Sequence, residues 1–130
     1  MYEILIVGGG PAGLTAAIYA ARAGKHVAVL ERGSTGGQII SAPLVENYPG
    51  IPSVSGTELA RQMTEQACTF GAEIVYTEAV GLEKTPAGFR VLCTDGVREA
   101  KTVILATGAA HRRLDLPWET TLTGCGVSYC

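Results

Sequence analysis

The sequence is short of charge, of long apolar runs and of histidine, and each shortage excludes a class of protein. Charged residues make up 17% of the 130 residues, and ten basic against twelve acidic side chains give a net charge of −2. Because no basic stretch extends beyond Arg112-Arg113, we do not expect a nucleic-acid-binding surface. No run approaches the ~18 apolar residues of a membrane span. The two histidines have no clustered ligand partners, so we expect no metal site.

The first residues also lack the features of a secretory signal. Met1-Tyr2-Glu3 carries an acid and leads directly into a short apolar run. The four cysteines do not form the spaced framework of a disulfide-rich domain. We therefore expect a cytoplasmic location and reduced cysteines, with Cys68 and Cys93 as small buried apolar residues.

Glycine, by contrast, is abundant. The chain has 17 glycines, about 13% of its residues against an average near ~7%. They stand in pairs and triplets between apolar runs, which is typical of a backbone that must approach a ligand closely. The 47% of hydrophobic residues is enough for a folded core, so disorder is excluded.

The apolar periodicity predicts an α/β fold. Four short apolar runs predict parallel strands, two stretches of helical period predict helices, and alternation over residues 80–100 predicts a small antiparallel meander. The expected strands are residues 4–7, 26–30, 73–76 and 102–106, and the expected helices run from Pro11 to Gly24 and from a Ser55–Glu58 capping box to Gly71. Residues 32–53 show little regular pattern, and a loop of that length usually has a function. The expected architecture is Rossmann-like, with a parallel sheet and a β-meander insertion.

Residues 8–13 read Gly-Gly-Gly-Pro-Ala-Gly and match the G-x-G-x-x-G fingerprint of dinucleotide-binding turns. In this pattern Gly8 allows the tight turn, Gly10 lets the backbone touch a pyrophosphate, and Gly13 permits close packing of helix on strand. The predicted helix directs its N-terminal N–H groups at the phosphates. Glu31, at the end of the second strand, would accept hydrogen bonds from an adenosine ribose and repel a 2′-phosphate, which favours FAD or NAD over NADP. The alternative is a packing loop with a solvated surface glutamate.

Residues 104–108, Ile-Leu-Ala-Thr-Gly, favour FAD over NAD. An apolar strand that ends in Ala-Thr-Gly is similar to an element of two-dinucleotide flavoprotein reductases, in which small residues abut the FAD pyrophosphate and ribityl group. The alternative is an ordinary exit from a strand into a turn. Its position after a βαβ unit and a meander favours the flavoprotein interpretation.

Three further segments make the resemblance specific: Gly36-Gly37-Gln38, residues 45–50 (Val-Glu-Asn-Tyr-Pro-Gly) and residues 126–130 (Gly-Val-Ser-Tyr-Cys). In order and spacing the chain resembles low-molecular-weight thioredoxin reductases from Tyr2 to Cys130. The resemblance implies that Gly37, Gln38 and Asn47 line the flavin side of an FAD site and that Val80 meets the adenine. The candidate FAD-binding residues are Gly8, Gly10, Pro11, Ala12, Gly13, Glu31, Arg32, Gly36, Gly37, Gln38, Asn47, Val80, Ala106, Thr107 and Gly108.

The resemblance also assigns a catalytic role to Cys130, which matches the first cysteine of the Cys-x-x-Cys redox pair of these enzymes. The family's second cysteine would follow it. A competing interpretation pairs Cys125 with Cys130 at the Cys-x₄-Cys spacing of glutathione reductase-like enzymes, although those enzymes carry that motif soon after the second strand. In the segment before it, Trp118 stands where the family has Gly in Pro-Gly-Glu, which weakens the expectation for that turn.

The resemblance implies that residues 1–130 are the N-terminal portion of an FAD-binding domain. The NADPH-binding domain and the segment that completes the FAD domain are expected outside these residues. The whole enzyme would pass electrons from NADPH through FAD and the cysteine pair to a thioredoxin-like protein, as a homodimer, and this chain alone is not expected to be catalytically competent. Two alternatives stay open: a ferredoxin-NADP reductase-like flavin oxidoreductase without the cysteine pair, and a non-catalytic nucleotide-binding module.

Overall fold

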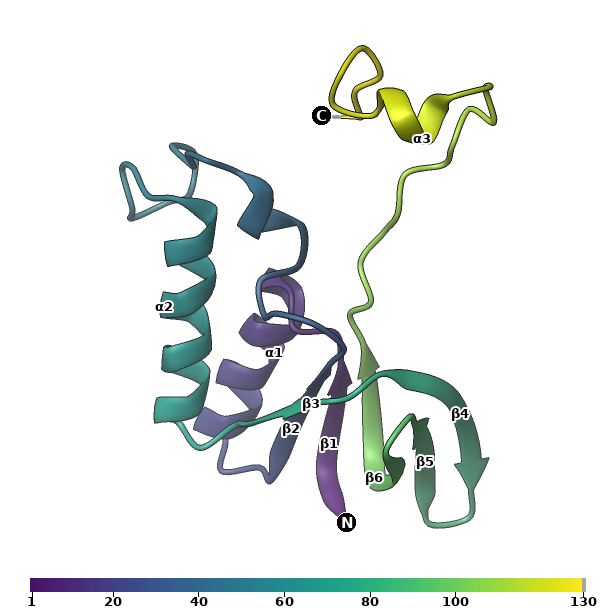
Figure 1. The fold of residues 1–130 in the computed structure, drawn as a ribbon. Helices are drawn as coiled ribbons and strands as arrows, with labels where there is room; N and C mark the ends of the chain where they lie inside the picture. Colours follow the sequence, from purple (N-terminus) through teal and green to yellow (C-terminus); the bar gives the residue numbers. More distant parts are fainter. Residues whose placement is uncertain (130) are drawn as a thin grey trace.

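The computed structural model describes residues 1–129, so the prediction for Cys130 lies outside the described residues. Strands and helices alternate at first, and three consecutive strands follow (Figure 1). The elements are β1 (Tyr2–Val7), α1 (Pro11–Arg22), β2 (Val27–Glu31), the 3₁₀ helix η1 (Gly37–Ser41), α2 (Gly56–Thr69), β3 (Glu73–Tyr76), β4 (Ala79–Thr85), β5 (Gly88–Cys93), β6 (Gly96–Leu105) and α3 (Glu119–Leu122). The predicted α/β class is confirmed.

The strands form one six-stranded sheet in the order β3-β2-β1-β6-β5-β4. The first four strands of this order run parallel, with Ile4 opposite both Val27 of β2 and Thr102 of β6. The strands β4, β5 and β6 pair antiparallel. Because parallel strands end at the same edge, the residues after β1, β2, β3 and β6 all lie at one edge of the sheet.

The sequence predicted a meander over residues 80–100 and a separate buried strand over 102–106, and this division is wrong. Both predicted segments belong to one strand, β6, whose first half pairs with β5 and whose second half pairs with β1. Ala100, which has no exposed surface, lies opposite Phe89 of β5 and Tyr2 of β1. The predicted burial at the end of this strand is also wrong, because Leu105 is 66% exposed.

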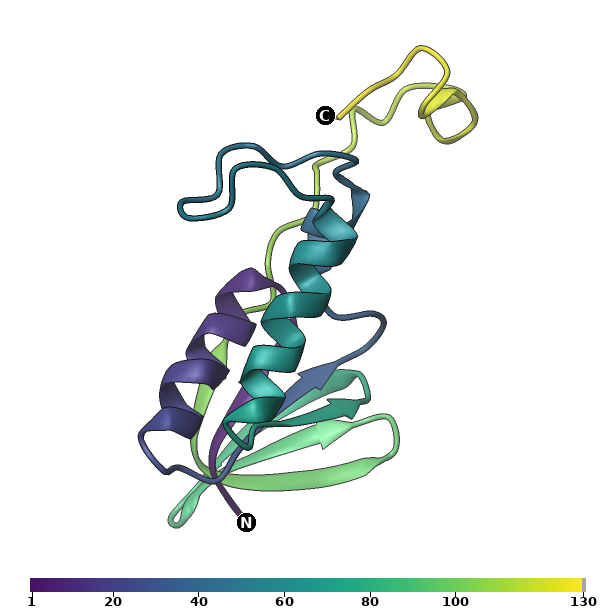
Figure 2. The same ribbon diagram turned by 90° about the vertical axis from the view of Figure 1, so that its left-hand side faces the viewer.

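Two apolar layers enclose the sheet. Both long helices pack on one face (Figure 2), and the predicted apolar face of α1 is buried there, including Leu14 and Ala17. On the opposite face Leu5 and Leu30 pack against Val91 and Cys93 of the meander. Alternate residues of β1 therefore point into different layers, as the period of a strand requires.

Of the two cysteines expected to be buried, only one is. Cys93 is 9% exposed, and burial raises the pKa of its thiol, so it stays protonated and inert at neutral pH. Cys68 is exposed on α2, and that prediction is wrong. The helical period predicts Leu59, Met63, Ala67 and Phe70 on the buried face of α2; the first three are buried, but Phe70, the C-cap residue, is 42% exposed. Cys68 directly follows Ala67 and therefore points about 100° away from it.

Helix α2 begins at the predicted Ser55 cap, but only half of the capping box forms. The hydroxyl of Ser55 accepts a hydrogen bond from the Glu58 N–H over 3.2 Å. The carboxylate of Glu58 accepts hydrogen bonds from Arg61 and Gln62 instead of returning to the cap. The guanidinium of Arg61 lowers the pKa of Glu58 to about 2.

After β6 the chain leaves the sheet and forms a separate turn around α3 (Figure 1). Glu119 is 5% exposed, and its carboxylate accepts hydrogen bonds from the N–H groups of Leu114 and Leu116 at 3.1 and 3.2 Å. Asp115 and Trp118 have positive φ values of 56° and 66°. The family resemblance predicts Gly in place of Trp118, and the left-handed backbone there gives the physical reason.

Replacing Trp118 by glycine is expected to stabilise this turn by about 1 kcal/mol, because the left-handed conformation costs a non-glycine residue about that much. Its indole is 76% exposed, so little packing is lost. Hydrogen exchange at the Leu114 and Leu116 amides, both bonded to Glu119, measures the effect locally. Slower exchange in the variant is expected. Unchanged or faster exchange would show that no strain resides at this position.

Candidate nucleotide-binding site

The glycine loop, residues 8–10 after β1, lies where the ends of β1 and β6 meet. Gly8 has a φ of +108°, which a side chain rarely adopts, and a Cβ there would lie 2.3 Å from the carbonyl oxygen of Ala106. The Ala106 N–H donates to the Val7 carbonyl over 2.8 Å and continues the pairing of β6 with β1. The Ala-Thr-Gly segment therefore starts directly beside the glycine loop.

Gly13 allows α1 to pack against the same loop. A Cβ on Gly13 would lie 1.9 Å from the carbonyl oxygen of Gly8, a distance that no side chain tolerates. The helix therefore starts immediately over the end of β1. Its first turn lies at the sheet edge where the parallel strands end.

The N-terminus of α1 is left open. Gly10 is its N-cap residue, Pro11 follows, and the first turn contains no acidic residue and receives no cap from a side chain within the described part of the chain. The nearest atom to a Cβ built on Gly10 is the Cα of Gly37, at 4.0 Å. Uncapped N–H groups and the positive end of a helix dipole, next to backbone without side chains, suit a phosphate.

Glu31 accepts hydrogen bonds from two loops at this edge, the glycine loop and the loop after β2. Its Oε2 accepts a hydrogen bond from the Gly9 N–H over 2.7 Å, and its Oε1 accepts one from the Gly33 N–H over 2.8 Å. The carboxylate thus lies at the end of β2 against the glycine loop. Each oxygen keeps a lone pair that could accept a further bond from a hydroxyl group. The sequence pointed to Glu31 as a ribose ligand but gave no sign of its bonds to the loops.

The Gly36-Gly37-Gln38 segment closes over the glycine loop. The Gly36 N–H donates to the Gly9 carbonyl over 2.7 Å, and a Cβ on Gly37 would lie 3.4 Å from the Cα of Gly10. The Gln38 side chain donates through Nε2 to the Ala109 carbonyl over 2.5 Å. Segments separated by about seventy residues in the chain therefore meet at this edge.

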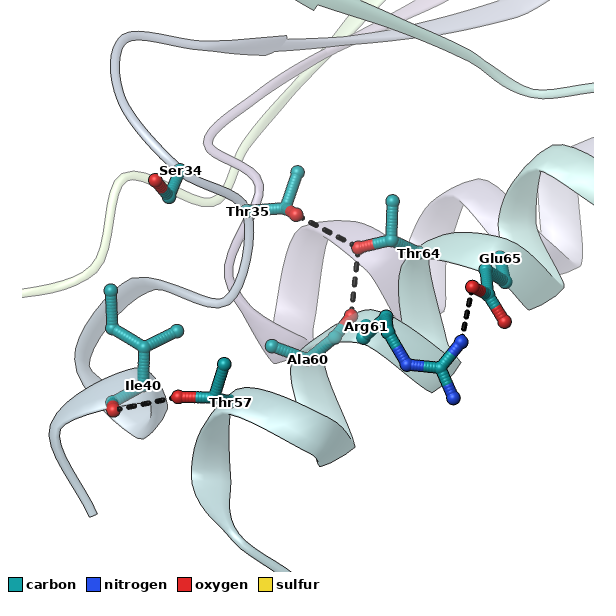
Figure 3. Close-up of a pocket in the computed structure, with 8 residues that line it drawn as sticks. All are labelled: Ser34, Thr35, Ile40, Thr57, Ala60, Arg61, Thr64 and Glu65. Carbon is teal, nitrogen blue, oxygen red and sulfur yellow. Dashed lines mark hydrogen bonds and ion pairs between the residues drawn. The ribbon is translucent and has the colours of Figure 1, made fainter. Parts of the chain in front are cut away.

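Beside this segment lies a hollow of about 500 Å³ between the loop after β2, η1 and α2 (Figure 3). None of the candidate FAD-binding residues lines it. Its hydroxyl groups bond to one another and to backbone: Thr64 donates to Thr35 over 2.9 Å or to the Ala60 carbonyl over 2.8 Å. A Cβ on Gly36 would lie 2.5 Å from the Cβ of Ala60. The contact between the loop and α2 therefore positions Gly36 and Gly37.

The remaining candidates lie around this edge with fewer contacts. The Arg32 side chain is 78% exposed and pairs with Glu78 at 3.7 Å. Val80, near the start of β4, is 63% exposed. Asn47 is exposed in the loop between η1 and α2, and no hydrogen bond of the described residues brings it to the glycine loop. Thr107 and Gly108 are exposed just after β6.

Sequence reasoning missed one polar residue at this edge. Thr77 follows β3, is 6% exposed, and donates its N–H to the Glu31 carbonyl over 2.9 Å. Its hydroxyl donates to Oδ1 of Asp95, in the turn between β5 and β6, over 2.5 Å. The pair is far apart in sequence, so no local pattern signals it.

No group of side chains within residues 1–129 has the composition and proximity to hold a metal ion. None of the helices in the same residues is long and apolar enough to cross a bilayer. Cys125 is exposed, and its potential partner Cys130 lies outside the described residues.

The sequence matches the model of the family described as pyridine nucleotide-disulphide oxidoreductase over residues 2–130. The thioredoxin reductase of Treponema pallidum is 45% identical, and the match covers 99% of this chain and 42% of that protein. The thioredoxin reductase of Bacillus subtilis is 41% identical, with coverage of 100% and 41%. The chain therefore spans about two fifths of the length of these curated relatives.

Solved structures give the same result. The Lactococcus lactis thioredoxin reductase in its FR conformation superimposes with a TM-score of 0.91 at 40% identity, covering 100% of this chain and 43% of that one. The Streptococcus pyogenes thioredoxin reductase gives 0.87 at 48% identity, covering 100% and 42%. The resemblance inferred from the sequence motifs is confirmed, and the chain belongs to the pyridine nucleotide-disulphide oxidoreductase family.

Proposed function

We propose that this chain binds FAD and forms the N-terminal portion of the FAD-binding domain of a thioredoxin-disulfide reductase. The observation that carries the proposal is the open N-terminus of α1, where the backbone of Gly10 faces that of Gly37 and Glu31 lies at the same edge. An uncapped helix terminus fits a pyrophosphate, and a carboxylate nearby fits a ribose. The relatives' names and lengths support the assignment to part of a thioredoxin reductase.

Each part of the cofactor has candidate residues in this arrangement. The amides after Gly10 would hold the pyrophosphate, with Ala106, Thr107 and Gly108 beside it. Glu31 would accept hydrogen bonds from the ribose, and Val80, with Arg32 nearby, would border the adenine. The amides of Gln38 and Asn47 would serve the flavin, whose edge offers donors and acceptors. When bound, FAD supplies two-electron redox chemistry; the chain's residues bind and orient it.

In the longer protein, NADPH would reduce the disulfide of a thioredoxin-like protein to a dithiol. Cys130 would be the first cysteine of the redox pair that exchanges with that disulfide. The NADPH-binding domain and the rest of the FAD domain would lie outside these residues; the chain spans 42% of the length of the Treponema pallidum relative, which leaves room for them. Thiol exchange of this kind belongs to a reducing compartment, so we place the protein in the cytoplasm, and we propose a homodimer.

Gel filtration of the chain after incubation with FAD tests the proposal. We expect a yellow protein peak with the absorption spectrum of oxidised flavin, about one flavin per chain. Added NADPH should leave that spectrum unchanged, because the residues that would bind it are expected elsewhere. A colourless chain that retains ADP would instead favour a non-catalytic nucleotide-binding module. A chain that retains neither contradicts the proposal.

A further inference from the structure

The connection from β3 to β4 is held at the sheet edge where the nucleotide would bind. The chain crosses there from the edge strand β3 to the meander (Figure 1). Thr77 begins this crossing, and its N–H bond to the Glu31 carbonyl extends the pairing of β2 with β3 by one residue. Among residues 1–129, Thr77 and Glu119 are the two buried polar or charged residues.

The turn between β5 and β6 forms hydrogen bonds with the connection from β3 to β4. Oδ1 of Asp95 accepts the Thr77 hydroxyl over 2.5 Å, and Oδ2 accepts a hydrogen bond from Arg98 over 2.7 Å. The Thr94 N–H donates to the Glu78 carbonyl over 3.0 Å. The Thr77 hydrogen bond, with Arg98 beside it, lowers the pKa of the Asp95 carboxyl. Asp95 is therefore ionised at neutral pH, and the extra stability that its charge gives to this bond is lost as the pH falls through that lowered pKa.

These contacts form one continuous chain of bonds to the glycine loop. Asp95 holds Thr77, the Thr77 amide holds the Glu31 backbone, and the Glu31 carboxylate holds the amides of Gly9 and Gly33. We propose that Thr77 and Asp95 are positioning residues for the adenosine end of the bound nucleotide: they hold Glu31 and the chain leading to Val80 in place. This inference rests on the proposed function.

The meander has apolar contacts with the sheet besides this hydrogen bond. Val91 and Cys93 already pack the meander onto Leu5 and Leu30 of the sheet. The Asp95 side chain is 50% exposed, so water can replace the lost donor at small cost. Removing the Thr77 hydroxyl should therefore leave the meander packed on the sheet and increase the mobility of the connection from β3 to β4 only.

Calorimetric titration of ADP into the chain, with unfolding midpoints measured in parallel, tests the inference. Thr77→Val and Asp95→Ala should each weaken ADP binding by about threefold to tenfold, the range typical of a coupling residue that does not touch ligand. The double variant should bind ADP no more weakly than whichever single variant has the lower affinity, because each single substitution already removes the bond between Thr77 and Asp95. Thr77→Ser, which keeps the hydroxyl, should restore binding.

Thr102→Val is the control: it removes a threonine hydroxyl that donates a hydrogen bond over 2.7 Å to the Glu3 carbonyl, at a position opposite Ile4 within the sheet and not in the connection after β3. It should bind ADP as the unmodified chain does.

A carboxyl NMR titration should show the pKa of Asp95 rising in Thr77→Val, as expected from the loss of its main stabilising bond. The inference is overturned if both Thr77→Val and Asp95→Ala bind ADP normally. It is equally overturned if their losses only track the unfolded fraction. A lack of ADP binding by the unmodified chain would overturn the proposed function as well.

Discussion

Replacing Gly10 by alanine is expected to weaken FAD binding about 100-fold while leaving the chain as stable as before. Gly10 has a φ of −75°, which alanine adopts without strain, and the nearest atom to the added Cβ is the Gly37 Cα at 4.0 Å. The methyl group therefore fits the folded chain. It stands, however, where the phosphate of the proposed FAD site would approach the first amides of α1, so the affinity should fall by roughly 100-fold, or about 2.7 kcal/mol.

Flavin fluorescence on titration with FAD measures the loss, and denaturant unfolding measures the stability. Gly24→Ala is the control, since Gly24 lies just after the C-cap of α1 with a φ of +72° and has no atom within 4 Å of a built Cβ. It should show the opposite pattern: a stability lower by about 1 kcal/mol from the left-handed backbone and normal FAD affinity. Normal FAD binding by Gly10→Ala would remove the glycine loop from the site.

The second large effect is expected at Glu31, where glutamine should not substitute for glutamate. Both carboxylate oxygens accept hydrogen bonds from backbone N–H groups, those of Gly9 and Gly33. A glutamine offers one accepting oxygen and must turn its NH₂ group toward the other N–H. We expect Glu31→Gln to lose about 1 kcal/mol of unfolding free energy, because one of the two backbone donors loses its acceptor.

The same change should weaken ADP binding about tenfold, because the glycine loop loses a tether and the ribose loses an acceptor. Denaturant unfolding and ADP titration measure the two losses separately. Glu46→Gln, in the exposed part of the irregular loop, is the matched control and should change neither quantity. If Glu31→Gln behaved like the control, the hydrogen bonds from the Gly9 and Gly33 N–H groups to Glu31 would contribute nothing to stability or to ADP binding.

Local patterns predicted the elements that position the site. The helical period of α1, the strand–glycine–helix order around Gly8 and the carboxylate of Glu31 can all be read within about thirty residues, because turns and helix starts depend on neighbours in sequence. The family resemblance added Gly36 and Gly37, whose roles no local pattern shows. Their packing against Ala60 and Gly10 appears only in the fold.

The features that could not be predicted depend on contacts between distant segments. Strand β6 was divided in two because its halves have different partners, β5 and β1, and so different burial patterns. The bond between Thr77 and Asp95 joins two turns that only the folded meander brings together. A threonine after a strand and an Asp-Gly turn are each ordinary in isolation.

Calorimetric titration of ADP into the unmodified chain tests the central claim most directly, because ADP carries the part of FAD that the glycine loop and Glu31 would hold. The account predicts saturable binding of one ADP per chain, rejection of the analogue with a 2′-phosphate, and loss of the signal in Gly10→Ala. A chain that takes up no ADP, or that binds ADP equally well after Gly10→Ala, would contradict it.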